Sequence, residues 1–301
     1  MPRIVVVGSL MMDLVVRAPR PALPGESLIG RSFATFTGGK GANQAIAAAR
    51  LGADVSLVGA VGNDAFGEEL LRAASADAVD TSHVVRLPVH GTGVAIPVVF
   101  DDGTNLIYAL PRANLALPVS AVEAAANLIA AADALLVQFE VAPEATLAAL
   151  RIARRAAVRT ILNPAPVAPH PQEVFTLADV LVPNEVEAAL LSGVAGDDPP
   201  AQARALLRLG PGAVIITLGE RGAFLATRGL EQAIPVPAVE AVDTVGAGDA
   251  FCGALAVRLA LGDDLAAAVR YACVAGALAC TRPGAAPSLP TADGVASLLQ
   301  G

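Results

Sequence analysis

Short apolar runs rich in β-branched residues recur along the chain and alternate with amphipathic, alanine-rich stretches. Runs of this kind that end in glycine or a polar residue are typical of central strands in a parallel sheet. We expect strands at 3–8, 54–62, 133–140, 158–166, 178–185 and 212–222, and helices at 41–52, 64–76, 143–156 and 199–209. This alternation predicts a single α/β domain over 1–301, with a doubly wound, mostly parallel sheet flanked by helices on both faces.

Two segments break the alternation. Residues from about 14 to 36 and from about 91 to 109 look like strands without helices between them. The second segment contains an Asp-Asp-Gly turn, which is typical of a hairpin. We therefore expect a small β-sheet that projects from the main layer.

Composition narrows the class of protein. Of 301 residues, 54% are hydrophobic and 16% charged, which excludes disorder and permits a large core. The net charge of −8 argues against a nucleic-acid partner. No apolar run reaches the roughly 18 residues of a membrane span, so a soluble protein without a membrane partner is expected. Three scattered cysteines and three scattered histidines make a zinc site improbable and fit a reducing, cytoplasmic setting.

The stretch AVDTVGAGDAF at 241–251 carries the strongest chemical signal. Gly246, Ala247 and Gly248 precede a predicted helix, where backbone N–H groups and the helix dipole favour an anion. Asp249 in the first turn could take a proton from a hydroxyl while this pocket stabilises charge on a transferred group. On this stretch alone, an ordinary glycine-rich turn with Asp249 as a helix cap fits equally well.

Lys40 is the only lysine in the chain, and it lies in GGKGANQA at 38–45. The glycines, Gly39 among them, allow close backbone approach, and the ammonium supplies a compact charge with three donors. Asn43 follows one turn later on the same side of the predicted helix. Sugars or phosphates suit this set, although a solvated lysine at a helix start is the simpler alternative.

Further polar residues follow the predicted strands. Asp13 and Glu140 come after the first and third runs, at the edge where open α/β sheets bind ligands. Asn184 and Glu187 lie three residues apart, a spacing suited to water-mediated magnesium or phosphate contact, or to a capped helix start. Thr217 and Gly219 end another run and could contact a nucleotide.

Taken in order, these motifs resemble one family. The series GSxxxD, GGKGANQA, NPAP, PNExE, ITLGxRG, DTxGAGD and TRPGAAPSLP resembles the ribokinase family of sugar kinases, the PfkB group, from residue 3 to about residue 290. The resemblance implies that Asp249 deprotonates a sugar hydroxyl beside an anion hole of Gly246, Ala247 and Gly248. It implies sugar contacts at Met11, Asp13, Gly39, Lys40, Asn43, Glu140 and Asp249, and nucleotide contacts at Asn184, Thr217, Gly219, Gly222, Gly248 and Cys273.

The same resemblance implies ions and partners. Mg²⁺ is expected to accompany ATP near Glu187. Potassium is expected as an activator, held by the side chains of Asp243 and Ser288 and the carbonyls of Val245, Ala279, Arg282 and Gly284. The projecting sheet resembles the lid of the family, which often pairs with the lid of a second subunit, so a homodimer is expected.

Three departures bear on the substrate. Members of the family often have asparagine where this chain has Met11, and AGAN where it has PRAN, with Pro111 and Arg112. Ala109 occupies a lid position where a larger apolar residue can occur. The expected reaction is ATP-dependent phosphorylation of D-ribose at O5. The alternatives are a kinase for a nucleoside or a sugar acid such as 2-keto-3-deoxygluconate, and a non-catalytic sugar-binding regulator. The layout would also fit an NAD-dependent oxidoreductase, but the chain lacks the GxGxxG fingerprint of that class.

Overall fold

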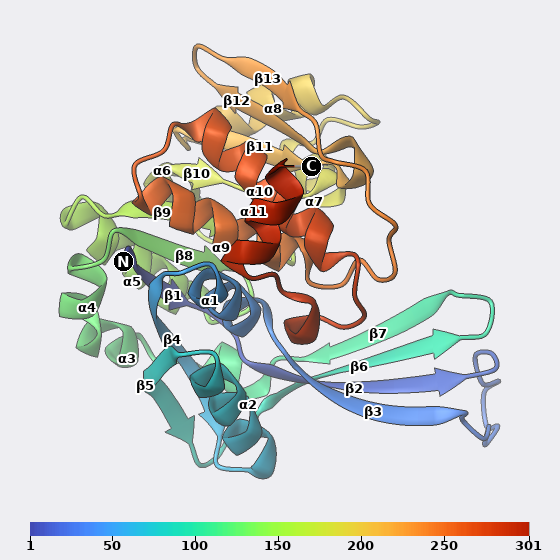
Figure 1. Cartoon of the computed structure of the whole chain (residues 1–301). Helices are drawn as coiled ribbons and strands as arrows, with labels where there is room; N and C mark the ends of the chain where they lie inside the picture. Colours follow the sequence, from blue (N-terminus) through green and yellow to red (C-terminus); the bar gives the residue numbers. More distant parts are fainter. Residues whose placement is uncertain (301) are drawn as a thin grey trace.

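The computed structural model describes residues 1–300, and a nine-stranded sheet forms its centre (Figure 1). The strand order is β13-β12-β11-β10-β9-β8-β1-β4-β5. The bounds are β1 Arg3–Val7, β4 Asp54–Gly62, β5 Val79–Leu87, β8 Ala134–Gln138, β9 Arg159–Asn163, β10 Val180–Leu181, β11 Ala213–Thr217, β12 Ala223–Thr227 and β13 Glu231–Ile234. The strands from β11 to β5 pair in parallel, whereas β12 and β13 are antiparallel.

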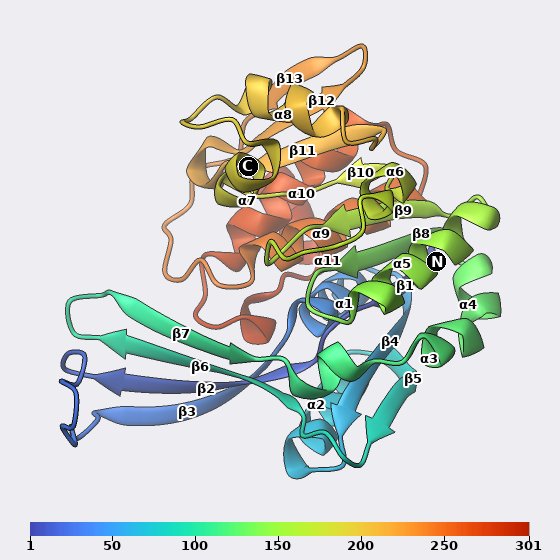
Figure 2. The same ribbon diagram turned by 180° about the vertical axis from the view of Figure 1, so that it is seen from behind.

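Helices cover both faces of this sheet, which confirms the predicted doubly wound architecture (Figures 1 and 2). Alternate residues of β1 divide between the two layers: Ile4 and Val6 pack with the core of one face, Val5 and Val7 with that of the other. The first layer contains α1 Lys40–Arg50, α2 Ala65–Ala76, α9 Ala247–Ala260, α10 Leu265–Ala279 and α11 Ala292–Gln300. The second contains α3 Val119–Ala124, α4 Ala126–Ala130, α5 Pro143–Arg155, α6 Glu173–Leu177, α7 Glu185–Ser192 and α8 Pro199–Leu207.

All six predicted strands and four predicted helices are present, with ends shifted by a few residues. The antiparallel edge, β12 and β13, and the last parallel strand, β5, were not predicted. β5 reads VDTSHVVRL and is mostly half-exposed, so its sequence lacks the continuous apolar run of a central strand. Edge strands are bounded by one neighbour only and need less apolar sequence.

A second sheet of four strands, in the order β3-β2-β6-β7, extends away from the main body (Figure 1). Its strands are β2 Met11–Ala18, β3 Ser32–Gly38, β6 Gly93–Phe100 and β7 Asn105–Leu110. The hairpins β2-β3 and β6-β7 are each antiparallel, and β2 pairs in parallel with β6. A small separate sheet was expected from the two segments that break the helix-strand alternation, and one is present.

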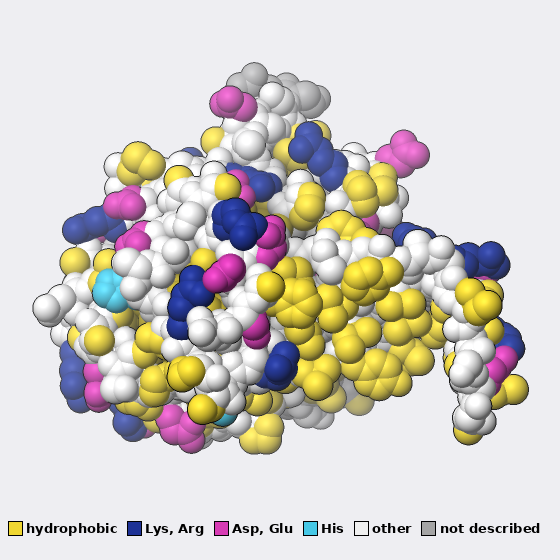
Figure 3. Space-filling model, turned by 90° about the horizontal axis from the view of Figure 1, so that it is seen from below, with side chains coloured by type: hydrophobic (Ala, Val, Ile, Leu, Met, Phe, Trp, Pro, Cys, Tyr) yellow, Lys and Arg dark blue, Asp and Glu magenta, His cyan; other side chains and the backbone are white. Residues whose placement is uncertain are grey.

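Strand register assigns each side chain of this small sheet to one of two faces. Asp13 is paired with Phe36 and Ala95, and Ala95 with Ala109, so these four share the inner face. The outer face carries only uncharged residues along the described strands: Met12, Leu14, Val16, Ala18, Phe33, Thr35, Thr37, Val94, Ile96, Val98, Phe100, Leu106, Tyr108 and Leu110. Seen from below, it forms a broad apolar surface (Figure 3).

Two polar joints connect the small sheet to the main body. The Asn114 side chain, after β7, accepts a hydrogen bond from the Leu10 N–H at 3.0 Å and donates to the Leu10 carbonyl at 2.9 Å. The Asp64 carboxylate accepts from the Thr92 N–H and hydroxyl, just before β6. Because β2 and β6 both leave the main body at these joints, the root of the sheet is fixed at two points.

Among the helices within residues 1–300, none is both long and apolar enough to cross a bilayer.

Candidate active site

Asp249 lies at the start of α9, where the carboxyl ends of the central strands meet. It is 6% exposed, and its two carboxylate oxygens accept hydrogen bonds from Asn43 Nδ2 at 2.9 Å and Gln44 Nε2 at 3.1 Å. No side chain caps α9, so Asp249 is not the helix cap that its sequence also allowed. Burial raises the pKa of Asp249, against the opposing effects of Lys40, Asn43 and Gln44.

Gly246 precedes α9 in the left-handed conformation, with a φ of 84°, which strongly favours glycine. A Cβ there would lie 3.1 Å from the Cα of Ala285. The loop 280–291 between α10 and α11, called the C-terminal loop below, therefore packs directly behind the turn. A Cβ on Gly248 would meet nothing within 4 Å. The Ala247 N–H donates to the Thr244 carbonyl at 3.3 Å. Gly246, Gly248 and Asp249 line an open cavity, so a phosphate-sized anion can reach this helix start.

Lys40 begins α1 and lies close to several carboxylates. Desolvation lowers its pKa, but Asp249, Glu140 and Glu187 outweigh that effect and raise the pKa of Lys40 above its ordinary value. The ammonium is therefore charged at neutral pH. It also lines a cavity of about 430 Å³ together with Asn184, Thr217 and Asp249.

Glu140, which follows β8, is tied to the same helix start. One of its carboxylate oxygens accepts the Lys40 N–H at 3.0 Å and the hydroxyl of Ser9, and the Ser9 oxygen accepts the Gly41 N–H at 3.3 Å. Burial raises the pKa of Glu140, opposed by Lys40 and Ser9. Glu140 and Ser9 thus satisfy the helix N–H groups that Gly39, with its φ of 93°, leaves without a side-chain cap.

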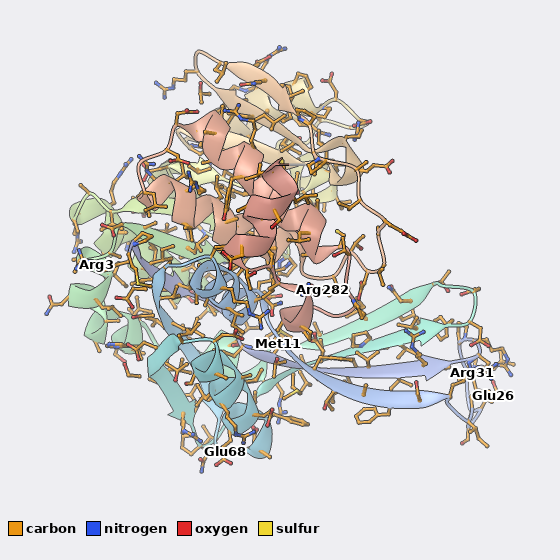
Figure 4. All side chains as sticks on the ribbon, viewed as in Figure 1. Arg3, Met11, Glu26, Arg31, Glu68 and Arg282 are labelled. Atoms are coloured by element: carbon orange, nitrogen blue, oxygen red, sulfur yellow. The ribbon has the colours of Figure 1, made fainter. Side chains whose placement is uncertain are left out.

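Met11 and Asp13 point from β2 toward the inner face of the small sheet. Burial, followed by the charges of Glu140 and Asp249, raises the pKa of Asp13 to about 6. Met11 is buried at the root of the strand, beside Gly38 and Gly93 (Figure 4). The charges of Asp249, Glu140 and Glu187 thus act on Lys40, and those of Glu140 and Asp249 also act on Asp13.

A larger cavity of about 720 Å³ opens beside this cluster. It shares Thr217, Gly219, Thr244 and Gly248 with the cavity at Lys40. Gly222 and Cys273 line it, together with apolar residues of the loop 236–241 and of α10. Its depth and largely apolar lining suit a planar ring system, with the shared residues placed toward the anion pocket.

Asn184 and Glu187 form a capping box at the start of α7. The Asn184 side chain accepts the Glu187 N–H, and a Glu187 carboxylate oxygen accepts the Asn184 N–H, both at 2.8 Å. The capped-helix interpretation of this spacing is therefore correct. Burial raises the pKa of Glu187, opposed by the Asn184 N–H and by Lys40. Its second carboxylate oxygen has no protein partner among the described residues, which leaves it available to water or a cation.

Asp243 joins the turn before α9 to the C-terminal loop. One carboxylate oxygen accepts the Val245 N–H at 3.0 Å and the other the Gly284 N–H at 2.8 Å. In the same loop the buried Ser288 hydroxyl donates to the Ala285 carbonyl at 2.9 Å. Behind Gly246, the Ala285 carbonyl oxygen would lie 3.3 Å from a Cβ at that position. Arg282, in the loop that follows α10, lies above the root of the small sheet in the view of Figure 4. No cluster of three or more histidine, cysteine, aspartate or glutamate residues suited to a metal ion occurs within residues 1–300.

Arg112 packs against the segment that precedes β6. It has a φ of 48°, its guanidinium lies over Gly91, and it donates to the Thr92 carbonyl at 3.1 Å. Its place is therefore at the joint of the small sheet. Ala109 lies on the inner face and is exposed, which leaves space opposite Ala95.

Sequence analysis missed the polar residues that orient these groups. Ser9, Gln44, Gln138 and Asn163 are all buried. Ser9, which follows β1, bonds to Glu140, and Gln44 of α1 bonds to Asp249. Gln138 and Asn163, which end β8 and β9, bond to Gln44. Gln138 and Asn163 end apolar strands, and a polar residue at such a position is the signal that could have identified them.

Comparisons with known proteins agree with this geometry. Residues 1–292 match the model of the pfkB family of carbohydrate kinases. The chain is 37% identical over 298 residues to the ribokinase of Staphylococcus aureus, covering 97% of this chain and 98% of the relative. It is 34% identical over 294 residues to the deoxyribokinase of Salmonella typhi, covering 96% of each.

Two further comparisons concern length and structure. A bifunctional ribokinase/ribose-5-phosphate isomerase A from Fructilactobacillus sanfranciscensis is 38% identical over 304 residues, and this chain spans 56% of its length. The Arabidopsis thaliana ribokinase complexed with ribose and ATP superposes with a TM-score of 0.93 at 32% identity, covering 100% of this chain and 99% of that one.

A doubly wound sheet, a projecting small sheet and an aspartate beside a glycine-lined helix start together define a kinase of small hydroxylated molecules. The chain belongs to the pfkB family of carbohydrate kinases.

The raised pKa of Asp13 leads to a prediction about stability. The folded-state pKa of Asp13, about 6, lies above the ordinary value of 3.8, so the folded protein disfavours the ionised carboxylate. The free energy of unfolding therefore falls as the pH rises from about 4 to 6 and Asp13 loses its proton. Asp13→Asn should therefore raise the free energy of unfolding at pH 8 by up to about 3 kcal/mol, and by progressively less toward pH 4. Urea unfolding across this range measures the effect.

Asp54→Asn, at the exposed start of β4, is the matched control and should change stability little at any pH. A loss of stability in Asp13→Asn that is the same at every pH would contradict the expected effect of burial.

Proposed function

We propose that this kinase transfers the γ-phosphoryl group of ATP to O5 of D-ribose, giving D-ribose 5-phosphate and ADP. The observation that carries the proposal is the buried Asp249, held by Asn43 and Gln44 beside Lys40 and an open helix start. The ribokinase names of full-length relatives support ribose as the sugar. The site is fully equipped with a base, an ammonium and an anion pocket, which weighs against a regulator that only binds sugar.

In the proposed reaction Asp249 accepts the proton of the sugar hydroxyl as O5 attacks the γ-phosphorus. The O5–P bond forms, the bond from phosphorus to the β,γ-bridging oxygen breaks, and ADP leaves with that oxygen. The N–H groups of Gly246, Ala247 and Gly248 stabilise the charge on the transferred group. Positioning supplies most of the acceleration in such a transfer.

The proposed sugar site lies between the inner face of the small sheet and α1. Asp13, Asn43 and Glu140 supply acceptors and a donor for sugar hydroxyls, Lys40 supplies an ammonium, and Gly39 allows close approach. Met11 borders this site. A small sheet that closes over the sugar would act as a lid and exclude water from the reaction.

The proposed nucleotide site is the larger cavity. Thr217, Gly219, Gly222 and Cys273 line it, and Asn184 lies where its phosphate end meets the cavity at Lys40. The larger cavity and the cavity at Lys40 share Thr217 and Gly248. A nucleotide bound in the larger cavity would therefore direct its terminal phosphate toward Asp249. This continuity is the observation that favours ATP in that cavity.

Two ions fit the residues present. Mg²⁺ would neutralise phosphate charge, with the free carboxylate oxygen of Glu187 holding its water shell. K⁺ would order the loops behind Gly246. Its ligands would be Asp243, Ser288 and the carbonyls of Val245, Ala279, Arg282 and Gly284, a set of oxygen donors of the kind that large monovalent cations take.

The use of ATP and three free thiols support a cytoplasmic, reducing setting for the enzyme.

A specific observation favours a second candidate substrate, 2-deoxy-D-ribose. Met11 is only 4% exposed at the proposed sugar site, and a thioether is at most a weak acceptor for a hydroxyl. A sugar hydroxyl left against it would lose its hydrogen bond to water, at a cost that a deoxy sugar avoids. The likeness to a deoxyribokinase at 34% identity supports this candidate.

Asp249→Asn tests the mechanism. Asparagine keeps the size of the side chain but cannot accept the proton, so kcat should fall by about 10²–10⁴-fold. Steady-state kinetics, circular dichroism and nucleotide titration on one preparation would show a folded, ATP-binding, nearly inactive enzyme. Asp54→Asn again serves as the control. A kcat within a few-fold of the unsubstituted enzyme would refute the role of Asp249.

Met11→Asn tests the choice of sugar. A new amide can bond one sugar hydroxyl, and a hydrogen bond of this type changes the ratio of kcat/KM for ribose over 2-deoxyribose by about 2- to 10-fold in favour of ribose. The values of kcat/KM for ribose and for 2-deoxyribose are measured by coupled ADP release, in the variant and in the unsubstituted enzyme. Met12→Leu, on the opposite face of β2, should leave the ratio unchanged. An unchanged ratio in Met11→Asn would place the discriminating hydroxyl elsewhere.

We further propose that two copies pair through the outer face of the small sheet. Phe33 and Tyr108 are 64% and 60% exposed on this uncharged face, and Leu106 and Leu110 continue it (Figure 3). An apolar face of this extent is unfavourable in water and marks an interaction surface. A second copy supplies the same apolar strands, so the two faces complement one another around a two-fold axis.

Tyr108→Asp tests the dimer. A carboxylate on the apolar face should convert a dimer to a monomer, because it would be desolvated without a partner. Sedimentation velocity or light scattering reports the mass in solution. Leu230→Asp, in the exposed turn between β12 and β13, is the control and should keep the dimer. A mass unaffected by Tyr108→Asp, or a monomeric unsubstituted enzyme, would exclude pairing through this face.

A further inference from the structure

Three buried amide side chains lie behind Asp249, and none of them belongs to the sugar or nucleotide contacts described above. Gln44 and Gln138 are 0% exposed and Asn163 is 9% exposed. They come from α1, β8 and β9, and all three meet at the carboxyl edge of the sheet. Buried amides in this number are costly unless their polar groups are paired. The contacts of Gln44 and Asn163 meet this condition, whereas the Gln138 Oε1 has no hydrogen-bond partner among the described residues.

The hydrogen bonds fix the orientation of each amide in turn. Asn163 Nδ2 donates to the Val182 carbonyl at 2.8 Å, which leaves Asn163 Oδ1 facing Gln44. Gln44 Nε2 donates to this Oδ1 and to Asp249, each at 3.1 Å. Gln138 Nε2 donates to Gln44 Oε1 at 2.6 Å. If the Gln44 amide were flipped, its carbonyl oxygen would face Asp249 and the Asn163 oxygen, and its NH₂ group would face the NH₂ group of Gln138. None of these contacts could then be a hydrogen bond.

This arrangement has a direct consequence for Asp249. Gln44 presents an N–H, never its carbonyl, to one carboxylate oxygen, while Asn43 presents an N–H to the other. The carboxylate is therefore held by one donor on each oxygen, with its remaining lone pairs free. A hydrogen bond from a neutral donor stabilises a buried carboxylate anion and disfavours its protonated form.

We propose that Gln44 is a positioning residue for phosphoryl transfer, which orients Asp249 and keeps it ionised, and that Gln138 and Asn163 set the direction of the Gln44 amide. The proposal rests on the proposed role of Asp249 as the base. Other charged or titratable groups also face Asp249, from β2, α1, the end of β8, α7 and α9 itself: Asp13, Lys40, Glu140, Glu187 and Cys252.

Gln44→Met provides the test, because methionine matches the length of glutamine without its hydrogen bonds. Loss of the bond to the carboxylate should move the acidic limb of the single-turnover rate up by about one to two pH units. On the acidic side of the limb the rate should fall by up to about 10- to 100-fold, in step with the shift, and it should recover toward pH 9. Binding of ATP, measured by titration, should not change. A merely structural role would instead lower the rate by the same factor at every pH.

Two further variants complete the test. Gln138→Met should shift the acidic limb in the same direction by a smaller amount, because Gln44 keeps its bond but loses the group that orients it. Gln202→Met is the matched control, since this glutamine is also buried and donates to backbone carbonyls, at the distant start of α8. It should change stability without moving the limb.

The outcomes separate this proposal from the mechanism on which it rests. If Asp249→Asn abolishes activity while Gln44→Met leaves the acidic limb in place, Gln44 has no positioning role and the base assignment stands. If Asp249→Asn is active, both fail. Should Gln44→Met not fold, Gln44→Glu preserves the shape and adds a like charge, which should shift the limb further in the same direction. An unshifted limb in that variant would overturn the proposal.

Discussion

The close crossing of α1 and α9 is the contact on which the rest of the site depends. A Cβ on Gly253 would lie 2.7 Å from the Cβ of Ala47 and 2.9 Å from the Gln44 carbonyl, so only glycine permits this approach. At the other side of α1, Gly41 lies against Gly8 at the end of β1, where a Cβ would be 2.4 Å from backbone atoms. These small residues bring a helix from each end of the sequence together, and a methyl group at either point would separate Asp249 from its donors.

Lys40 gains its properties from the same crossing. Its ammonium lies where carboxylates from α9, α7 and the end of β8 converge, and their charges outweigh the cost of removing it from water. The arginines behave differently: Arg151 pairs with Glu173 and Arg204 with Glu231 at the exposed surface, where ion pairs contribute little. A compact ammonium suits the crowded interior position, whereas the planar guanidinium suits two-point pairing in open solvent. The single lysine therefore lies in a cluster of carboxylates at the site, unlike Arg151 and Arg204 at the surface.

The sequence predicted the parts that are encoded locally. Periodicity identified the parallel strands of the main sheet except β5. The Asp-Asp-Gly turn identified a hairpin of the small sheet, and the glycine-rich stretch at 246–248 identified the start of the helix that carries Asp249. It could not predict the partners of Asp249, because Asn43 and Gln44 are 206 and 205 positions away. Only the folded sheet brings Gln138, 94 positions from Gln44, into the same cluster. The orientation of Arg112 was equally hidden, since it depends on a positive φ and on the space above Gly91.

The small sheet is connected by contacts to the turn before α9. Its inner face carries Asp13, and its strand β3 carries Phe36, whose ring lies next to Gly284 in the C-terminal loop. Gly284 in turn donates its N–H to Asp243, and Asp243 accepts the N–H of Val245 immediately before Gly246. A continuous series of contacts therefore runs from the inner face of the small sheet to the anion pocket. Through Phe36 and Gly284, the packing of the small sheet therefore bears on the backbone immediately before Gly246.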